Sequence, residues 1–109
     1  MTTAVLCGPD EDGLGDALSA AGVTVTRIDD RATRPALEEA GIYDADLLVL
    51  TDLAEAAAVP IARDLNDDLR TVVYASEGLP EFLGASEVLK VDPRLLDAEA
   101  VAEELLNGH

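Results

Sequence analysis

The sequence predicts a three-layer α/β protein, in which about five parallel strands form one sheet that helices cover on both faces. Short apolar runs alternate with helix-like patterns along all 109 residues, as expected for repeated strand–helix units. The run Leu47–Leu50 contains no polar residue, which is typical of a central strand buried on both sides. A chain of this length is expected to form a single domain over residues 1–109.

The predicted strands are the apolar runs that lie between turn residues. They span Ala4–Cys7, Val23–Ile28, Asp46–Leu50, Thr71–Ala75 and Glu87–Val91. The predicted helices follow the strands and show the spacing of one apolar face. They span Leu14–Ala21, Arg34–Ala40, Leu53–Leu65, Pro80–Leu83 and Pro93–Leu106.

Residues at the helix ends support this division. Thr33 is expected to cap the second helix, and Gly22 and Gly41 stand where helices stop. Asp92 precedes Pro93 and so predicts the start of the last helix at that proline. In that helix an apolar stripe is expected to pack on the sheet. Its members are Leu95, Val101, Ala102, Leu105 and Leu106.

Pro60 lies inside the third predicted helix. Proline removes a backbone hydrogen-bond donor and clashes with the preceding turn. We therefore expect this helix to break near Ala58.

The charge of the chain is strongly negative, with 23 acids against seven bases and a formal net charge of −16. Such a surface repels phosphate backbones and anionic lipids, so we expect no nucleic-acid partner. A hydrophobic content of 49% with clear periodicity argues against disorder. The acids, together with a single lysine, Lys90, indicate a halophilic protein adapted to a salt-rich cytoplasm.

Targeting and membrane signals are missing from the sequence. The chain has neither an apolar stretch of about 20 residues nor the pattern of a signal peptide. We expect a cytoplasmic protein with no direct membrane insertion.

Groups for catalysis or metal binding are scarce. Cys7 is the only cysteine and is expected to be a buried structural thiol, which excludes an intrachain disulfide and a cysteine-rich zinc site. The only histidine is His109, and neither a G-x-S-x-G elbow nor a G-x-x-x-x-G-K-[ST] loop is present. The sequence therefore predicts no enzyme, no catalytic residue and no metal site.

Candidate ligand residues lie at the carboxyl ends of the strands, where open parallel sheets bind ligands. The first loop, GPDEDGLG, carries Gly8, Gly13 and Gly15, but their spacing differs from G-x-G-x-x-G. The acids Asp10–Asp12 between these glycines would satisfy the helix dipole themselves and repel a pyrophosphate.

Two further pairs of residues end the next strands. Asp29 and Asp30 follow the second strand, where they could bind a ribose diol or remain solvated acids. Thr51 and Asp52 follow the central strand and would face a ligand crevice, although Asp52 could equally cap a helix.

The phrases ATRPALEEAGIYDADLLVLTDLAE, IARDLNDDLRTVVYAS and LGASEVLKVDP resemble the N-terminal domain of TrkA. This family, also called the RCK (regulator of potassium conductance) domain, has a Rossmann-like fold. The resemblance covers Val23 to Pro93 and implies a regulatory domain that binds NAD or an adenine nucleotide, dimerises and gates a membrane partner.

This chain departs from that family in two ways. First, its glycine loop is longer and more acidic than that of the family. Second, it lacks one strand–helix unit, which we infer from the short segment between Ile28 and the Ala32-Thr33 phrase. Asp29 therefore corresponds either to the ribose-binding acid of that family or to the later acid that precedes its Ala-Thr pair. Five strands in the order 2-1-3-4-5, a flavodoxin-like arrangement, would remain. We expect a non-catalytic regulatory domain in which dinucleotide binding is weakened or lost.

Two alternatives stay open. The order 2-1-3-4-5 is also that of response-regulator receivers, with Asp10–Asp12 as the acidic pocket, Asp52 or Thr51 as phosphoacceptor, and Ser76 and Lys90 as the other partners. The second alternative is an interaction scaffold that binds a protein partner and no small ligand.

We also expect a homodimer, formed through the small side chains of Ala54–Val59. The competing interpretation is that these alanines only pack on the sheet.

Overall fold

All strands of the sheet run parallel, in the order β2-β1-β3-β4-β5. The computed structural model describes residues 2–28, 31–76, 78 and 88–107. The strands in these residues are β1 (Thr3–Cys7), β2 (Thr24–Ile28), β3 (Leu47–Leu50), β4 (Arg70–Tyr74) and β5 (Val88–Val91). The predicted fold class and strand order are confirmed, because this is the flavodoxin-like order of a doubly wound α/β protein.

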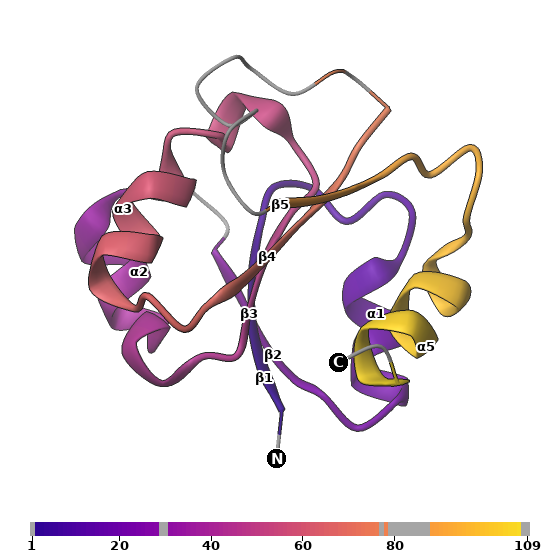
Figure 1. The fold of residues 1–109 in the computed structure, drawn as a ribbon, viewed down its shortest axis with the longest axis horizontal. Coiled ribbons are helices and arrows are strands. Elements are labelled where there is room, and N and C mark those ends of the chain that lie inside the picture. The colour runs from indigo at the N-terminus through magenta and orange to yellow at the C-terminus, as the bar shows by residue number, and fades with distance from the viewer. Residues whose placement is uncertain (1, 29–30, 77, 79–87, 108–109) are drawn as a thin grey trace.

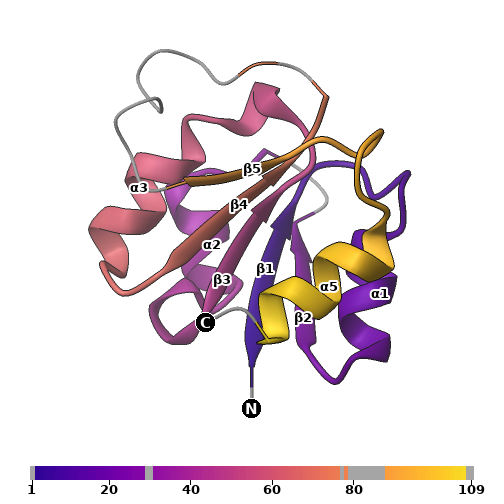
Figure 2. The ribbon, with the colours of Figure 1, turned by 45° about the vertical axis from the view of Figure 1, so that its right-hand side comes forward.

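Helices cover both faces of the sheet (Figures 1 and 2). The helix α1 (Leu14–Ala20) lies beside α5 (Ala98–Asn107) on one face, and α2 (Arg34–Glu39) lies with α3 (Ala58–Leu65) on the other. Two short 3-10 helices, η1 (Ile42–Asp44) and η2 (Leu53–Glu55), precede and follow β3. None of the described helices has the length and apolar content that a membrane crossing needs.

The sheet divides the hydrophobic core into two halves, because successive side chains of a strand point to opposite faces. Val5, Leu48 and Leu50 pack toward α2 and α3. Leu6 and Val49 pack toward α1 and α5. All four residues of β3 are buried, which confirms that this run is a central strand covered on both sides.

The third helix breaks where Pro60 predicted. The chain leaves η2 after Glu55, and α3 begins at Ala58. Pro60 thereby falls in the first turn of α3, where the backbone N–H that proline lacks would have no intrahelical acceptor in any case.

The last helix begins later than predicted. The segment from Pro93 forms a turn, in which the backbone N–H groups of Leu95 and Leu96 both donate to the carbonyl of Asp92. Asp97 caps α5 instead, since its carboxylate accepts the N–H of Ala100 at 2.9 Å. Leu95 is therefore 80% exposed and does not belong to the stripe that packs on the sheet.

The helix predicted over Pro80–Leu83 lies outside the described residues. Within them, η1 is an element that sequence patterns did not predict. Asn66 holds this turn, because its amide donates to the carbonyl of Ile42 at 3.0 Å and to that of Ala45, just after η1, at 2.9 Å.

Candidate functional site

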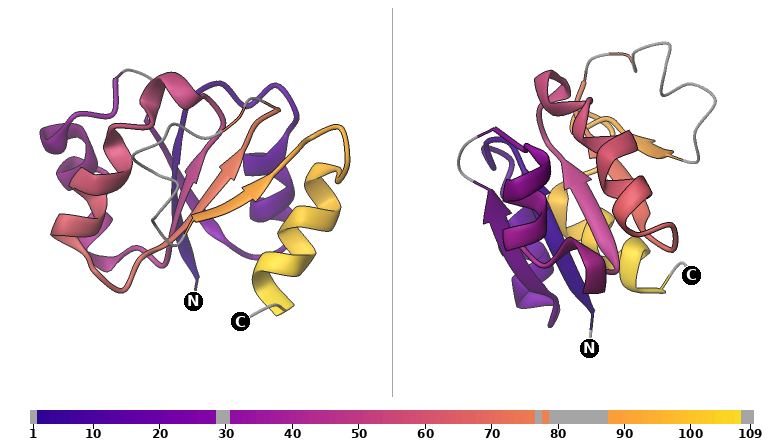
Figure 3. Two further views of the ribbon diagram at one scale, coloured as in Figure 1. Left: turned by 45° about the horizontal axis from the view of Figure 1, so that its top comes forward. Right: turned by 90° about the vertical axis from the view of Figure 1, so that its left-hand side faces the viewer.

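The carboxyl ends of the five strands bring their following loops to one edge of the sheet (Figure 3). Two predicted site residues, Asp29 and Asp30, lie outside the described residues. The other five lie in or beside these loops. They are Gly8, Gly13, Gly15, Thr51 and Asp52.

Gly8 lies directly against the tip of β3. Its φ is +106°, and a Cβ added there would meet the hydroxyl of Thr51 at 2.6 Å and the backbone nitrogen of Asp52 at 3.0 Å. The Thr51 hydroxyl also contacts the carbonyl oxygens of Cys7, at 3.3 Å, and of Pro9. The loop after β1 is thus packed onto the tip of β3.

Asp10 occupies the start of α1. Its carboxylate accepts the backbone N–H of Gly15 at 3.1 Å and pairs with the Arg27 guanidinium of β2 at 2.9 Å. The second guanidinium nitrogen of Arg27 contacts Asp16 at 3.1 Å. A phosphate group at a helix N-terminus would use these same N–H and cationic groups, so Asp10 stands in the position of such an anion.

The other loops at this edge are also held by internal hydrogen bonds. Asp52 accepts the N–H of Ala54 at 2.9 Å and so caps η2, which confirms the capping alternative for this residue. Glu55 accepts the N–H of Ala32 at 2.8 Å and joins η2 to the segment before α2. Both carboxylates thus accept hydrogen bonds from backbone N–H groups of their own chain.

Lys90, in β5, and Asp92, just after β5, also bind groups of their own chain. The Lys90 ammonium donates to the carbonyl of Ala75. Asp92 accepts three hydrogen bonds from the Arg94 side chain and one from its backbone N–H, and these contacts lower the pKa of Asp92 to about 2. Asp92 therefore stays ionised at neutral pH.

The acids of the receiver-like alternative have different surroundings in the structure. Asp10 is bound by Arg27, Asp52 caps η2, and Glu11 and Asp12 are exposed. In the part of the chain that the structure describes, no three Asp, Glu, His or Cys side chains gather closely enough to hold one metal ion.

Cys7 confirms the prediction of a buried thiol. It is 1% exposed. Burial raises the pKa of the Cys7 thiol to about 12, and the nearby charge of Glu55 adds to the rise. A thiol that stays protonated at neutral pH is a poor nucleophile.

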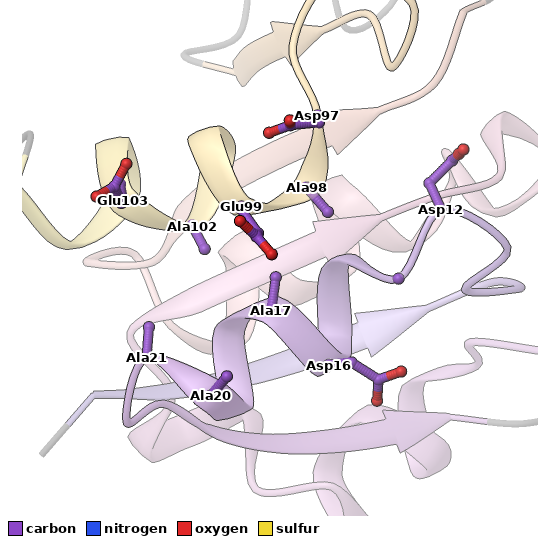
Figure 4. A pocket seen from close by; sticks show the side chains of 11 residues that line it. Asp12, Asp16, Ala17, Ala20, Ala21, Asp97, Ala98, Glu99, Ala102 and Glu103 are labelled. Carbon is purple, nitrogen blue, oxygen red and sulfur yellow. The ribbon is translucent and has the colours of Figure 1, made fainter.

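A second feature lies on the α1/α5 face of the molecule. It is a groove of about 730 Å³ between the two helices, and we call it the α1–α5 groove (Figure 4). Alanines from both helices line it, and Ala17 of α1 points toward Ala98 and Ala102 of α5. The other residues that line the groove are Asp12, Gly13, Asp16, Ala20, Ala21, Asp97, Glu99 and Glu103.

The α1–α5 groove is strongly negative. Its lining contains the five exposed carboxylates of Asp12, Asp16, Asp97, Glu99 and Glu103 and no lysine or arginine. Of these five, Asp16 is paired with Arg27. The sequence predicted the acidity of the chain, but it did not predict this groove, because α1 and α5 are separated by most of the chain.

Sequence reasoning also missed the role of Arg27. It lies in a strand with no apparent motif and reaches Asp10 only because β1 and β2 pair with Cys7 beside Ile28. The signal available in the sequence was weak, namely an arginine near the carboxyl end of a strand next to an acidic loop.

Comparison with known proteins places the fold in a wider context. A family model described as "Family of unknown function (DUF7126)" matches residues 4–105. No curated protein matches the chain.

Two crystal structures are similar to this fold. One, from Burkholderia pseudomallei, is described as a pilus assembly-related protein; it is 22% identical, the match covers 97% of this chain and 87% of the other, and the TM-score is 0.68. The other, described as the pilus assembly protein CpaE from Burkholderia thailandensis, is 22% identical with 97% and 96% coverage and a TM-score of 0.64. At this level of identity the likeness shows the fold.

Proposed function

The chain belongs to the DUF7126 family, and we propose that it is a receiver-like interaction module that acts by binding another protein. In this proposal it neither carries a nucleotide nor accepts a phosphoryl group. The proposed function keeps the regulatory, non-catalytic role expected from the sequence and assigns it to a surface that binds a protein.

The main support for this proposal comes from the carboxyl edge of the sheet, where groups of the chain itself make the contacts that a bound nucleotide would need. Asp10 takes up both the Gly15 N–H and the Arg27 guanidinium, and Gly8 is packed against Thr51. A nucleotide would have to displace a carboxylate that is 11% exposed, and removing a charge-assisted hydrogen bond of this kind costs roughly 1.5–3 kcal/mol.

The remaining support comes from the fold. The strand order is that of receivers and flavodoxins. The two similar structures are described as pilus assembly proteins, and proteins that take part in an assembly act by contacting other proteins.

A titration followed by amide NMR in concentrated KCl tests the proposal. ATP, NADH, and magnesium with a small phosphodonor are each added to millimolar concentration. We expect no localised change at Gly8–Gly15, Thr51 or Lys90.

Two results would contradict the proposal. Shifts confined to Gly8–Gly15 and Thr51–Leu53 with a nucleotide would favour the function implied by the TrkA resemblance. Joint shifts of Asp10–Asp12, Asp52 and Lys90 with magnesium and phosphodonor would favour a phosphorylated receiver.

A further inference from the structure

We propose that the α1–α5 groove is the docking site of this module and that its occupant is a short basic amphipathic helix of a partner protein. This inference rests on the proposed function and adds the binding surface and the chemistry of the partner. In such a complex, small or apolar residues of the partner helix would lie on the alanine floor, and its lysines or arginines would reach the carboxylates of the rim.

The shape of the α1–α5 groove supports a helix as occupant. The groove runs between α1 and α5, with a volume of about 730 Å³ and alanines of both helices in its lining. Ala98 and Ala102 are buried, Ala17 is half-buried, and Ala20 is exposed. Side chains this small allow the backbone of a third helix to approach α1 and α5 closely, as in helix-in-groove recognition.

Charge complementarity supports a basic occupant. Five of the eleven lining residues are acids, and all five are exposed. A second copy of this chain would bring a negative surface to this negative groove, so the homodimer expected through Ala54–Val59 would leave the α1–α5 groove free.

The spacing of the acids favours several cationic side chains over one metal ion. The rim carboxylates come from the loop before α1, from α1 itself, from Asp97 just before α5 and from α5 (Figure 4). They do not form a group that could hold a metal ion within the described residues. Separate charges around an apolar floor suit the separate ammonium or guanidinium groups of one amphipathic helix.

Three synthetic peptides test this proposal on the intact chain. The first is a helix of about 20 residues, longer than the roughly 12–15 residues below which an isolated helix is marginal in water, with alanines along one face and lysines on both sides of that face. The second has glutamine in place of each lysine. The third has the composition of the first with a central proline that prevents a helix. Binding is measured by calorimetry and amide NMR, at the lowest KCl concentration at which the domain stays folded.

We expect the lysine helix to bind and to shift the amides of residues that line the α1–α5 groove. The glutamine peptide should not bind, and the proline peptide should bind at least tenfold more weakly. In the protein, the double substitution Glu99→Gln and Glu103→Gln should weaken the lysine helix about tenfold, since it removes two charge pairs.

The matched control carries the same loss of charge outside the α1–α5 groove, through Glu39→Gln on α2 and Glu104→Gln on α5. It should change the affinity less than about twofold. Ala20→Leu fills part of the groove without changing any charge, and we expect it to weaken binding as well.

The proposal would be overturned by equal effects of the groove and control variants, by an unchanged affinity in Ala20→Leu, or by equal binding of the proline peptide. Shifts spread over the acids of α2 would overturn it too. If the lysine helix does not bind and the nucleotide titration shows no localised shift, the α1–α5 groove is excluded as the docking site, but the proposed function is not. A localised nucleotide response instead excludes the proposed function itself.

Discussion

The guanidinium of Arg27 lies 2.9 Å from the carboxylate of Asp10 and so joins the edge strand β2 to the loop that leads into α1. Asp10 in turn accepts the N–H of Gly15. Asp10 therefore holds the start of α1 through the N–H of Gly15 and ties it to the edge strand β2 through its ion pair with Arg27. The stability of this loop depends on Asp10 more than on any of its acidic neighbours.

Replacing Asp10 with alanine should lower the free energy of unfolding by about 1–2 kcal/mol, because a helix-end hydrogen bond and an ion pair are lost together. Arg27→Gln should cost less, at most about 1 kcal/mol, since the contact of Asp10 with Gly15 remains and Arg27 is partly exposed. Glu11→Ala is the control and should have almost no effect. Urea unfolding at constant salt measures all three. Equal losses for Asp10→Ala and Glu11→Ala would contradict the role of Asp10.

Gly8→Ala should destabilise the protein by about 2–4 kcal/mol, because it adds a clash with the backbone of Asp52 and with Thr51 to an unfavourable positive φ. Gly13 is the matched control. Its φ is +75° and a Cβ added there meets nothing within 4 Å, so Gly13→Ala should cost only about 1 kcal/mol. A thermal or urea unfolding series compares the two variants, and a similar cost for both would mean that Gly8 does not pack against the β3 tip.

Cys7 should resist alkylation in the folded protein and react readily once the protein is unfolded. Burial raises the pKa of the Cys7 thiol from its ordinary value of 9.0 to about 12 in the folded protein. Between these values the unfolded state releases the thiol proton and the folded state keeps it, so this group makes the protein less stable as pH rises above about 9. Labelling at pH 8, with and without denaturant, checks the reactivity. Denaturant midpoints at pH 8 and 10 for wild type and Cys7→Ala check the linkage, which the variant should lack.

Thr71→Val should stabilise the protein by about 1 kcal/mol. The Thr71 side chain is 3% exposed, and its hydroxyl has no hydrogen-bond partner among the described residues. Valine has a similar shape and removes the cost of burying an unpaired polar group. Thr26→Val, at an exposed position of β2, is the control and should stay within about 0.5 kcal/mol. A clear loss of stability in Thr71→Val would show that the hydroxyl is bonded after all.

The melting temperature should rise as KCl is increased from dilute buffer to molar concentration at neutral pH. The molecule measures 31 × 29 × 26 Å, and the screening length is about 30 Å at 0.01 M salt and about 3 Å at 1 M. In dilute buffer each of the 23 acids therefore interacts with acids across the whole molecule. A melting temperature independent of salt would show that the acidic surface is not a salt adaptation.

The homodimer expected from Ala54–Val59 remains a prediction. Ala56, Ala58 and Val59 are buried in the core on the α3 side of the sheet, whereas Ala54 and Ala57 are exposed. Packing within the chain therefore explains the small apolar side chains at half of the positions in Ala54–Val59. Light scattering at high protein concentration and high salt distinguishes the two states.

Much of this fold was determined by local sequence patterns. Apolar runs placed the strands, Thr33 and Gly41 placed the ends of α2, and Pro60 placed the break before α3, because each acts through its own backbone geometry. The start of α5 was mispredicted because Asp92-Pro93 and Asp97 are both acceptable helix starts. The choice of Asp97 depended on a turn whose backbone N–H groups bond to the Asp92 carbonyl.

The candidate sites depended on tertiary structure. The sequence predicted an acidic, glycine-bearing loop and a negatively charged chain, and both follow from residue types alone. That Asp10 meets Arg27 follows from the pairing of β1 with β2, and that alanines and acids of α1 and α5 form one groove follows from the packing of both helices on the same face of the sheet. Such contacts join residues far apart in the chain, and no local preference encodes them.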